Sequence, residues 1–348
     1  MLIIKSLVRW LNTKRLHQVD LFRRFPMEVQ EETLFKLLEK GKNTEYGRKR
    51  GFDKFSGISD FQSNVPLIDY DGVKPYVERL RKGETNLLWP GEVKWFAKSS
   101  GTTNDKSKFI PVSNDALEEC HFRGGKDVLA IYNDLFPENG LFSGKGLTLG
   151  GSHQIDNYSN ESYYGDLSAI LIENLPWWAD FIRTPSQKVA LIPEWDRKLA
   201  ELTSETLKEN VTNIAGVPSW NLVMIKHILD FTGKNNLLEI WPNLELFTHG
   251  GVNFTPYRDQ FQRLIPSSQM HYMETYNASE GFFAIQDNPC RNDMLLMLDY
   301  GIFYEFIPTD QLGSPNPTAY TIADVEVNKN YAMVITTNSG LWRYMIGD

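Results

Sequence analysis

Cysteine is scarce in this sequence and never clustered. Two of the 348 residues are cysteine, Cys120 and Cys290, and no CxxC pattern occurs. Such spacing provides neither a disulfide framework nor a zinc ribbon. So few cysteines are typical of a reducing compartment, and we therefore expect a cytoplasmic protein.

The sequence also lacks an excess of basic over acidic residues, and it lacks long apolar runs. The net charge of -8 provides no electrostatic basis for binding nucleic acid or an anionic membrane. No stretch approaches the ~18 consecutive apolar residues that cross a bilayer. Basic residues interrupt the N-terminal apolar stretch, which therefore does not match a signal peptide. Because apolar residues recur there at helical spacing from Leu2 to Trp10, we predict an amphipathic helix that packs on the body.

The rest of the composition, with 41% hydrophobic and 13% aromatic residues, is that of a folded globular protein. The first quarter of the chain has helical patterns, and the periodic stretch Glu28–Lys40 is followed by Gly41, a residue type expected just beyond a helix. Val93–Ala97 predicts a strand that leads directly into the small-residue loop Ser99–Thr103. Ser113 is a suitable N-cap for a long helix.

Further along, apolar runs alternate with amphipathic ones. Strands are predicted at Leu147–Leu149, Val211–Ala215, Leu244–Phe247 and Met270–Thr275. Helices are predicted near Lys198–Asn210, Trp220–Phe231 and Tyr257–Leu264. This alternation predicts an α/β fold with a mostly parallel, helix-covered sheet.

After Gly281 the pattern changes to consecutive β runs separated by turn residues. The predicted strands are Met294–Leu298, Ile302–Ile307, Tyr320–Val327 and Tyr331–Thr337. Residues 281–348 are therefore expected to form a β-rich subregion, as an antiparallel sheet or partial barrel.

The first motif with chemical content is KSSGTTNDKSKFIP, Lys98–Pro111. A loop of Ser, Gly and Thr can turn tightly and direct backbone N–H groups and hydroxyls at a phosphate. Lys106 and Lys108 follow the loop and can neutralise phosphate charge. A solvated turn with a lysine-rich exit fits this segment equally well. It is not a Walker A loop, because it lacks GxxxxGK[ST].

The second motif is ETYNASEG, Glu274–Gly281. Tyr276 can stack on a purine, Ser279 can hydrogen-bond a phosphate, and Glu280 can bind Mg²⁺, which prefers oxygen ligands. The alternative is a strand-end turn whose glutamate faces water.

Two further segments complete the set. GLWRYMIGD, Gly340–Asp348, ends in a carboxylate that can accept both hydroxyls of a ribose, although a Gly-Asp pair alone is simply a turn. THGGVNFTP, Thr248–Pro256, places Gly250 and Gly251 after a strand, where they allow close approach to a planar ligand or merely connect a strand to a helix.

Together, in this order and over essentially the whole chain, the motifs resemble the adenylate-forming superfamily of acyl-CoA synthetases and luciferase. Within it they are most similar to the Gretchen Hagen family of acyl-acid amido synthetases. SSGTT with Lys108 resembles the phosphate loop of that family, YNASE its Tyr-x-x-Ser-Glu motif, and GLWRYMIGD its C-terminal Gly-Asp segment. Met345 stands where plant members have Arg, which leaves a role for that position open.

The resemblance implies a role for each matched residue. It assigns Mg²⁺ and catalysis to Glu280, and acid binding to Arg123 on the helix after the loop. It also assigns catalysis to Lys108. ATP is expected to contact Ser99, Ser100, Gly101, Thr102, Thr103, Gly250, Gly251, Tyr276, Ser279 and Asp348.

The implied reaction is ATP-dependent activation of a carboxylic acid, followed by transfer of the acyl group to the amine of an amino acid. An acyl-CoA synthetase and a non-catalytic nucleotide-binding protein are the alternatives. The family also has a small C-terminal lid after the Gly-Asp segment. Since the sequence ends at Asp348, we expect residues 1–348 to be an adenylation domain without its lid, which binds adenine nucleotides but turns over slowly.

One geometric expectation follows from these assignments. Thr103, Tyr276, Glu280 and Asp348 should line one cleft. The sequence does not identify the acid, because the shape of the binding pocket sets the specificity. Residues near Phe122, His153 and Tyr163–Tyr164 are the candidates for this pocket.

Overall fold

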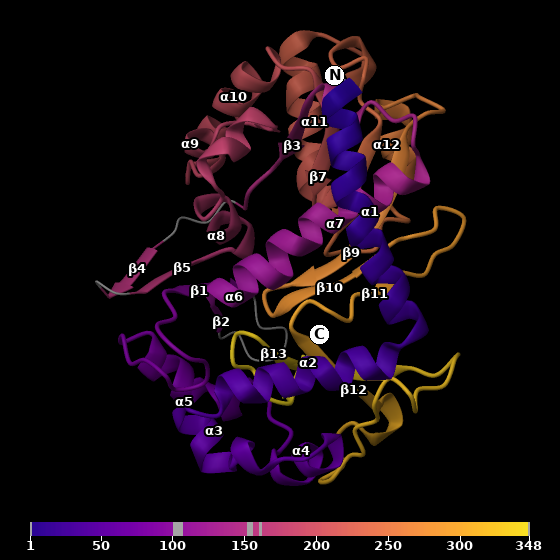
Figure 1. Ribbon diagram of the computed structural model, residues 1–348. Coiled ribbons are helices and arrows are strands. Elements are labelled where there is room, and N and C mark those ends of the chain that lie inside the picture. Colours follow the sequence, from indigo (N-terminus) through magenta and orange to yellow (C-terminus); the bar gives the residue numbers. More distant parts are fainter. Residues whose placement is uncertain (1, 100–106, 152–155, 160–161, 347–348) are drawn as a thin grey trace.

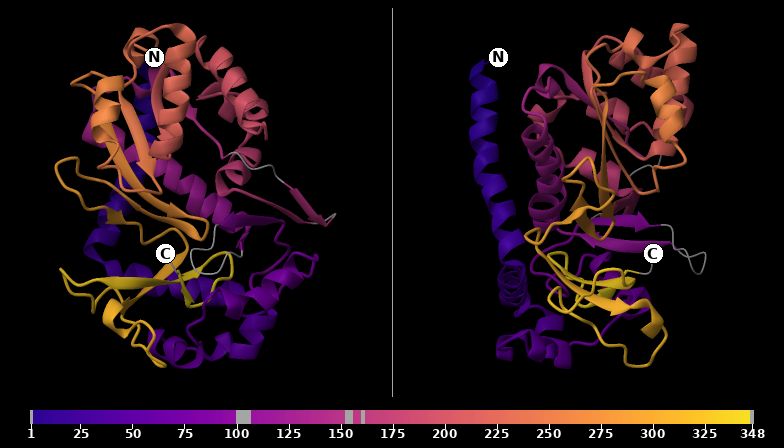
Figure 2. Two further views of the ribbon diagram at one scale, coloured as in Figure 1. Left: turned by 180° about the vertical axis from the view of Figure 1, so that it is seen from behind. Right: turned by 90° about the vertical axis from the view of Figure 1, so that its right-hand side faces the viewer.

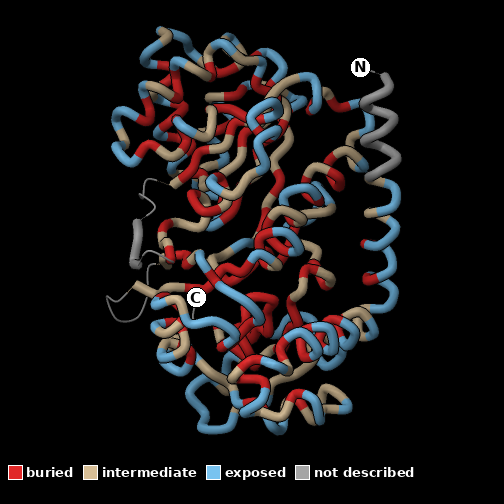
Figure 3. Tube along the Cα trace, turned by 60° about the vertical axis from the view of Figure 1, so that its left-hand side comes forward, coloured by how far each residue is buried: buried red, intermediate tan, exposed pale blue. Residues whose placement is uncertain are grey.

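The computed structural model describes residues 2–99, 107–151, 156–159 and 162–346 (Figure 1). Helices form the N-terminal part, as predicted. They are α1 (Leu2–Arg24), α2 (Pro26–Gly41), α3 (Glu45–Arg50), α4 (Ile58–Asn64) and α5 (Tyr70–Leu80), with a 3-10 turn η1 (Phe52–Lys54). Helix α1 runs along the outside of the molecule and is mostly exposed over its described side chains (Figure 3).

Helix α1 packs on the body through its C-terminal half, whereas the contacts predicted for the apolar residues from Leu2 to Trp10 stay a prediction. Val19 and Phe22 are buried in the core, and Arg15 forms ion pairs with Asp127 and Asp299. The side chains of residues 1–11 lie outside the described part.

The prediction that Gly41 lies beyond helix α2 is wrong, because Gly41 is the last residue of the helix and Lys42 is its C-cap. Packing explains the glycine. A Cβ at position 41 would lie 2.6 Å from Cζ2 of Trp342, so a larger residue would displace the indole ring.

A small four-stranded sheet follows, in the order β2-β1-β5-β4. Its strands are β1 (Trp95–Ser99), β2 (Lys108–Val112), β4 (Asp156–Ser159) and β5 (Ser162–Gly165). Strands β1 and β2 are antiparallel, and β1 and β5 are parallel. The predicted strand Val93–Ala97 thus exists, shifted by two residues toward the loop.

A long helix connects this sheet to the rest of the molecule. It begins with α6 (Asn114–Ala116), continues through a π-helical turn η2 (Leu117–Phe122) and ends with α7 (Arg123–Leu135) (Figure 1). We call these segments together the 114–135 helix. The predicted N-cap is confirmed, since the Ser113 hydroxyl accepts a hydrogen bond from the Ala116 N–H at 3.0 Å.

The main sheet has seven strands in the order β11-β10-β9-β8-β7-β3-β6. The strands are β3 (Lys145–Thr148), β6 (Arg183–Thr184), β7 (Val211–Gly216), β8 (Leu246–Gly250), β9 (His271–Ala278), β10 (Gly281–Ile285) and β11 (Leu295–Leu296). Strands β6, β3, β7, β8 and β9 are parallel, which confirms the predicted parallel sheet, and β10 and β11 continue it antiparallel.

Helices cover this sheet, and apolar side chains fill both of its faces. Those after β5 are α8 (Leu167–Glu173), α9 (Gln187–Ala190), α10 (Trp195–Thr206), α11 (Pro218–Thr232) and α12 (Arg258–Leu264); short 3-10 turns are η3 (Leu141–Ser143), η4 (Trp177–Phe181) and η5 (Leu237–Glu239). One core lies between the sheet and α10, α11 and α12, and the other joins α1, α2, the 114–135 helix and the C-terminal strands. Figure 2 shows two parts, which we call the upper lobe, made of the main sheet and its covering helices, and the lower lobe, made of α2 to α5 and the C-terminal strands.

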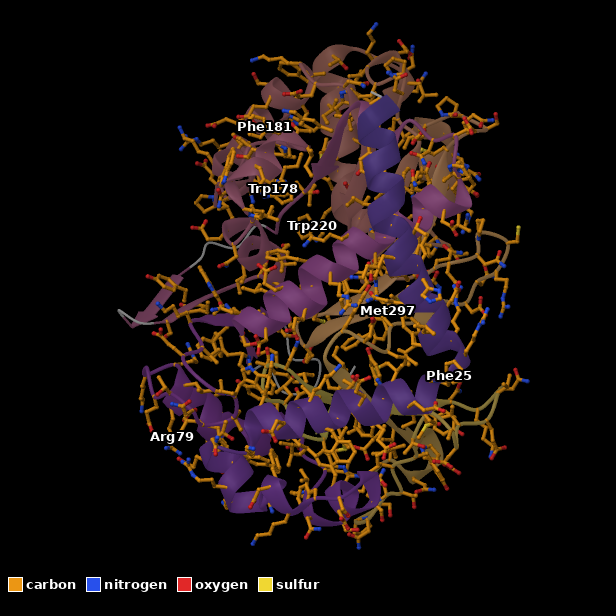
Figure 4. All side chains as sticks on the ribbon, viewed as in Figure 1. Phe25, Arg79, Trp178, Phe181, Trp220 and Met297 are labelled. Carbon is orange, nitrogen blue, oxygen red and sulfur yellow. The ribbon has the colours of Figure 1, made fainter. Side chains whose placement is uncertain are left out.

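The C-terminal part is a three-stranded antiparallel sheet of β12 (Ile302–Pro308), β13 (Tyr331–Thr337) and β14 (Tyr344–Met345), with the 3-10 turn η6 (Thr309–Gln311). Two predictions for this part are wrong. The run Met294–Leu298 does contain a strand, β11, but the strand belongs to the main sheet and not to the C-terminal sheet where it was predicted. There the N–H of Met297 (labelled in Figure 4) continues the pairing by donating to the Phe283 carbonyl at 2.8 Å.

The second error is the predicted strand Tyr320–Val327, which forms only one bridge, between Tyr320 and Phe306. Beyond it the Asp324 carboxylate accepts a hydrogen bond from the Thr321 hydroxyl and closes a turn. Val327 is 89% exposed. Ile322 packs against the core, but beyond the Tyr320 bridge the run has no strand to pair with, so its β-favouring residue types do not make a strand.

Candidate functional site

The candidate phosphate loop connects two strands of one hairpin. Ser99 at the end of β1 is the partner of Lys108 at the start of β2. The predicted arrangement, a strand that leads directly into the loop, is confirmed on its strand side. Lys108 therefore lies at the base of the loop. Ser100, Gly101, Thr102 and Thr103 lie outside the described residues.

The second motif forms the turn of the β9–β10 hairpin. Ala278 pairs with Gly281, so Ser279 and Glu280 are the two turn residues. Glu280 is only 7% exposed, which excludes the alternative of a carboxylate that faces water. Tyr276 is half-buried on β9, with its ring centroid 4.9 Å from that of Phe283.

The glycine pair lies at the same end of the main sheet. Gly250, the last residue of β8, is the partner of Thr275 on β9, one residue before Tyr276. A Cβ at position 250 would lie 2.4 Å from the Thr275 carbonyl oxygen, and Gly251 has φ +80. Both positions therefore need glycine for the backbone alone. This is the carboxyl end of the parallel strands, where open α/β sheets bind their ligands.

A residue that the motifs did not reveal precedes the glycine pair. His249 is buried, and its ring stacks on Phe254 at 4.0 Å between centroids. Burial, helped by the charge of Arg258, lowers the pKa of His249 to about 4. The imidazole is therefore neutral at pH 7, so the residue next to Gly250 in the sequence carries no charge.

The 114–135 helix and its N-cap Ser113 contact the segments next to all three main motifs. It follows β2 directly, with only Ser113 between them. The Ser113 N–H donates to the Ser339 hydroxyl at 3.0 Å, and the Ser113 hydroxyl donates to the Asn338 carbonyl at 2.6 Å. Asn338 and Ser339 immediately precede the Gly340–Asp348 segment.

The middle of the same helix binds the second motif. The Phe282 N–H donates to Sγ of Cys120 at 3.2 Å, and Phe282 is two residues beyond Glu280. Figures 1 and 2 place the β9–β10 hairpin, β1 and β2 at one level, between the two lobes. The described flanks of the motifs thus meet on one helix. The expectation of a shared cleft stays a prediction, because Thr103 and Asp348 lie outside the described residues.

Arg123 is engaged elsewhere in this structure. Its Nη2 donates to the Asp299 carboxylate at 2.7 Å and its Nη1 to the Asp299 carbonyl at 3.0 Å. It borders an open groove of about 900 Å³ that α1 and α2 also line. Arg123 therefore faces α1, whereas Cys120 contacts β10. Its role in binding the acid stays a prediction.

The Gly340–Asp348 segment is anchored by Arg343. This residue is 6% exposed, and its guanidinium pairs with the buried carboxylate of Glu305 at 2.8 and 2.9 Å. Met345 lies on β14, and its N–H donates to the Ile68 carbonyl at 2.8 Å. Asp348 itself lies outside the described residues.

The guesses for the acid pocket remain untested. Phe122 ends the π-helical turn, while Tyr163 and Tyr164 lie on β5 against Trp95 and Phe109. His153 lies outside the described residues.

Exposed aromatic side chains on η4, including Trp178 and Phe181, lie in the upper lobe, above the β9–β10 hairpin (Figure 4).

Three further features of the described residues concern metals, membranes and cysteines. Within the described ranges, no three His, Cys, Asp or Glu side chains gather as a metal site. No helix in the part of the chain that the structure describes is long and apolar enough to cross a membrane. Cys120 is buried, Cys290 is exposed, and neither forms a disulfide.

Known structures have the same fold. A GH3.15 acyl acid amido synthetase in complex with 2,4-DB superposes with a TM-score of 0.76 and 18% identity, over 92% of this chain and 64% of that chain. An open conformation of 2-hydroxyisobutyryl-CoA ligase in complex with 2-HIB-AMP and CoA superposes with a TM-score of 0.59 and 11% identity, over 91% of this chain and 67% of that chain. The fold is thus that of adenylate-forming enzymes.

Sequence comparison identifies the family. Residues 15–270 match the GH3 family N-terminal domain, and residues 295–348 match the GH3 family central domain. The chain belongs to the GH3 family. It is 25% identical to an indole-3-acetic acid-amido synthetase of Arabidopsis thaliana, over 96% of this chain and 66% of the relative. It is 24% identical to a jasmonoyl-L-amino acid synthetase of Nicotiana attenuata, over 92% of this chain and 66% of the relative. The chain spans slightly less than two thirds of the length of these relatives.

Proposed function

We propose that this chain uses ATP to activate a carboxylic acid as an acyl-adenylate and passes the acyl group to the amine of an amino acid. The supporting observation is that, in a GH3-family chain, the described flanks of the three candidate nucleotide motifs meet on the 114–135 helix and its N-cap Ser113. Relatives named as amido synthetases support the choice of an amino acid as acceptor.

The chemistry explains why ATP is needed. A carboxylate reacts poorly with amines, because its leaving group would be an oxide. One carboxylate oxygen bonds to the α-phosphorus of ATP, and the bond to pyrophosphate breaks. The amine then attacks the acyl carbon, loses a proton, and AMP leaves. These steps need positioning and stabilisation of phosphate charge, and no protein nucleophile.

The residues present suit this chemistry. We propose that Ser99 and Lys108, at the base of the β1–β2 loop, contact the phosphates, and that Tyr276 and the Gly250–Gly251 pair contact the adenine. Loop residues Ser100, Gly101, Thr102 and Thr103, together with Ser279 and Asp348, complete the proposed ATP contacts.

Glu280 suits a magnesium ion, because a carboxylate in a tight, buried turn is a hard oxygen ligand. A bound Mg²⁺ would neutralise phosphate charge. Magnesium usually takes one or two protein carboxylates and completes its shell with phosphate and water. A single Glu280 is therefore a sufficient protein contribution.

Three further assignments belong to the proposal. Residues 1–348 act as the adenylation domain, Arg123 contacts the acid after release from Asp299, and the protein works in the cytoplasm. Neither Cys120 nor Cys290 forms a disulfide, which supports the assignment to the cytoplasm.

Calorimetry with the chain as it stands tests the function. We expect Mg-ATP binding, which Glu280→Gln weakens by about tenfold while AMP affinity changes little, because only the triphosphate needs the metal. Glu31→Gln, on an exposed part of α2, is the matched control. Failure of the native chain to bind Mg-ATP would contradict the proposal.

Pyrophosphate release with a panel of aryl and fatty acids then tests catalysis. Amino-acid-dependent release of AMP supports the amido synthetase reaction. CoA-dependent release would instead indicate an acyl-CoA synthetase. Nucleotide binding without release for any acid would favour the non-catalytic alternative.

A further inference from the structure

The thiol of Cys120 forms a reciprocal contact with the backbone of Phe282. The Phe282 N–H donates to Sγ at 3.2 Å, and the S–H can donate to the Phe282 carbonyl at 3.8 Å. Burial raises the pKa of the Cys120 thiol to about 12, so the sulfur keeps its proton. Cys120 therefore acts here as a hydrogen-bonding group and not as a nucleophile.

The next turn of the helix contacts the side chain of the same residue. A Cβ at Gly124 would lie 2.5 Å from Cγ of the Phe282 ring, so the helix backbone rests directly on the ring. At Gly125, by contrast, a Cβ would meet nothing within 4 Å. The 114–135 helix thus holds both the backbone and the ring of Phe282.

Phe282 lies where the hairpin needs an outside constraint. The pairing of β9 with β10 shifts register between Phe282 and Ala284, so the ladder is irregular next to the turn. A bulge bends its strand and leaves a residue unpaired. The position of the Ser279–Glu280 turn is therefore set by what holds Phe282 from outside, in addition to the ladder.

We propose that Cys120 and Gly124 are positioning residues that fix Phe282 and, through it, the Glu280 carboxylate in the nucleotide site. The inference rests on the proposed function. The helix that they belong to follows β2 directly, so the contact links the position of β2, which begins at Lys108, to that of the Glu280 turn. Neither residue needs to touch the nucleotide.

Two pairs of variants test this. Cys120→Ala removes the thiol, with Cys290→Ala as control on the exposed cysteine. Gly124→Ala pushes the helix off Phe282, with Gly125→Ala as control on the adjacent residue. We expect the two test variants to weaken Mg-ATP binding by about 3- to 10-fold, the effect of losing one modest interaction. AMP affinity should change less than about twofold, and the controls should match the native protein.

Cys120→Ser supplies a rescue variant, because a hydroxyl can donate and accept at the same place. It should recover part of the Mg-ATP affinity that Cys120→Ala loses. In a Glu280→Gln background, Cys120→Ala should have no further effect on Mg-ATP binding, because the carboxylate that it positions is already gone.

The outcomes separate the two proposals. Lack of Mg-ATP binding by the native chain, or a Glu280→Gln variant that binds as the native chain does, contradicts the proposed function. If Glu280→Gln behaves as expected but Cys120→Ala weakens Mg-ATP and AMP equally, or adds its effect to that of Glu280→Gln, the positioning role is wrong. If Gly124→Ala does not fold, the Cys120 series decides alone.

Discussion

Replacing Arg343 by Ala should destabilise the fold more than any exposed charge does. The side chain of Arg343 makes two hydrogen bonds to Glu305, at 2.8 and 2.9 Å. Its Nη1 also donates to the carbonyls of Gln62 and Val65, at 2.7 Å each. These contacts join the C-terminal strands to the C-terminal end of α4 and its C-cap, Val65.

The size of the effect follows from burial. Glu305 is 1% exposed, so removal of the guanidinium leaves a carboxylate in the core without its cation. Breaking a buried ion pair on one side costs about 3–5 kcal/mol. Alanine also keeps the strained φ of +47 at this position. Since the whole stability of a domain is about 5–15 kcal/mol, this is a large share.

Urea unfolding followed by circular dichroism measures the effect. We expect Arg343→Ala to lower the free energy of unfolding by about 3–5 kcal/mol, and the double change Arg343→Met with Glu305→Leu to cost less than the single one, because no charge stays buried. Arg291→Ala breaks the exposed pair with Asp293 and should cost at most about 1 kcal/mol. A loss below about 1 kcal/mol for Arg343→Ala, or a larger loss for the double variant, would refute the reasoning.

Three further results are expected. Burial lowers the pKa of His121 to about 4. Between about pH 6.5 and pH 4 the unfolded chain therefore binds a proton on this histidine and the folded chain does not. Stability falls as the pH drops through this range, and His121 contributes about 3 kcal/mol to the fall. Urea titrations at pH 7 and 4.5 should show a smaller fall for His121→Gln and an unchanged one for exposed His17→Gln. Gly250→Ala should cost about 1–3 kcal/mol and weaken AMP binding, measured by calorimetry, because its Cβ would lie 2.4 Å from a strand carbonyl, whereas Gly57→Ala, with open space around it, should change neither. Arg15→Ala, which removes two ion pairs to the body, should cost about 3 kcal/mol and speed hydrogen exchange in α1.

Sequence reasoning succeeded where one local signal determines one local structure. The Ser113 cap, the parallel strand Val211–Gly216 and the helix Pro218–Thr232 follow from side-chain type and periodicity alone. Each of these elements buries one apolar face or satisfies one set of N–H groups, so its own residues specify it. The glycine pair at the end of β8 is predictable for the same reason.

It failed where the partner is distant in sequence. Tyr320–Val327 has strand-forming residues but no neighbour to pair with beyond a single bridge. The run Met294–Leu298 was expected to pair with the strands that follow it, yet its strand, Leu295–Leu296, pairs with β10. Gly41 has a helix-ending residue type, but Trp342, some 300 residues later, determines its place. Pairing and packing of this kind depend on the whole fold, and no local window contains them.

The same distinction applies within the candidate site. Ser99, Lys108 and Glu280 could be proposed from the sequence because phosphate and metal chemistry restrict the residue types that can serve in such a site. Cys120 and Gly124 carry no such chemical signature, since a small residue on a helix is ordinary. Their proposed importance comes only from contact with Phe282. The backbone nitrogen of Phe282 lies 3.2 Å from Sγ of Cys120, and a Cβ at Gly124 would lie 2.5 Å from Cγ of the Phe282 ring. Groups that bind a ligand are constrained by the ligand and can be found in a sequence, whereas groups that position them are constrained by neighbours and require the structure.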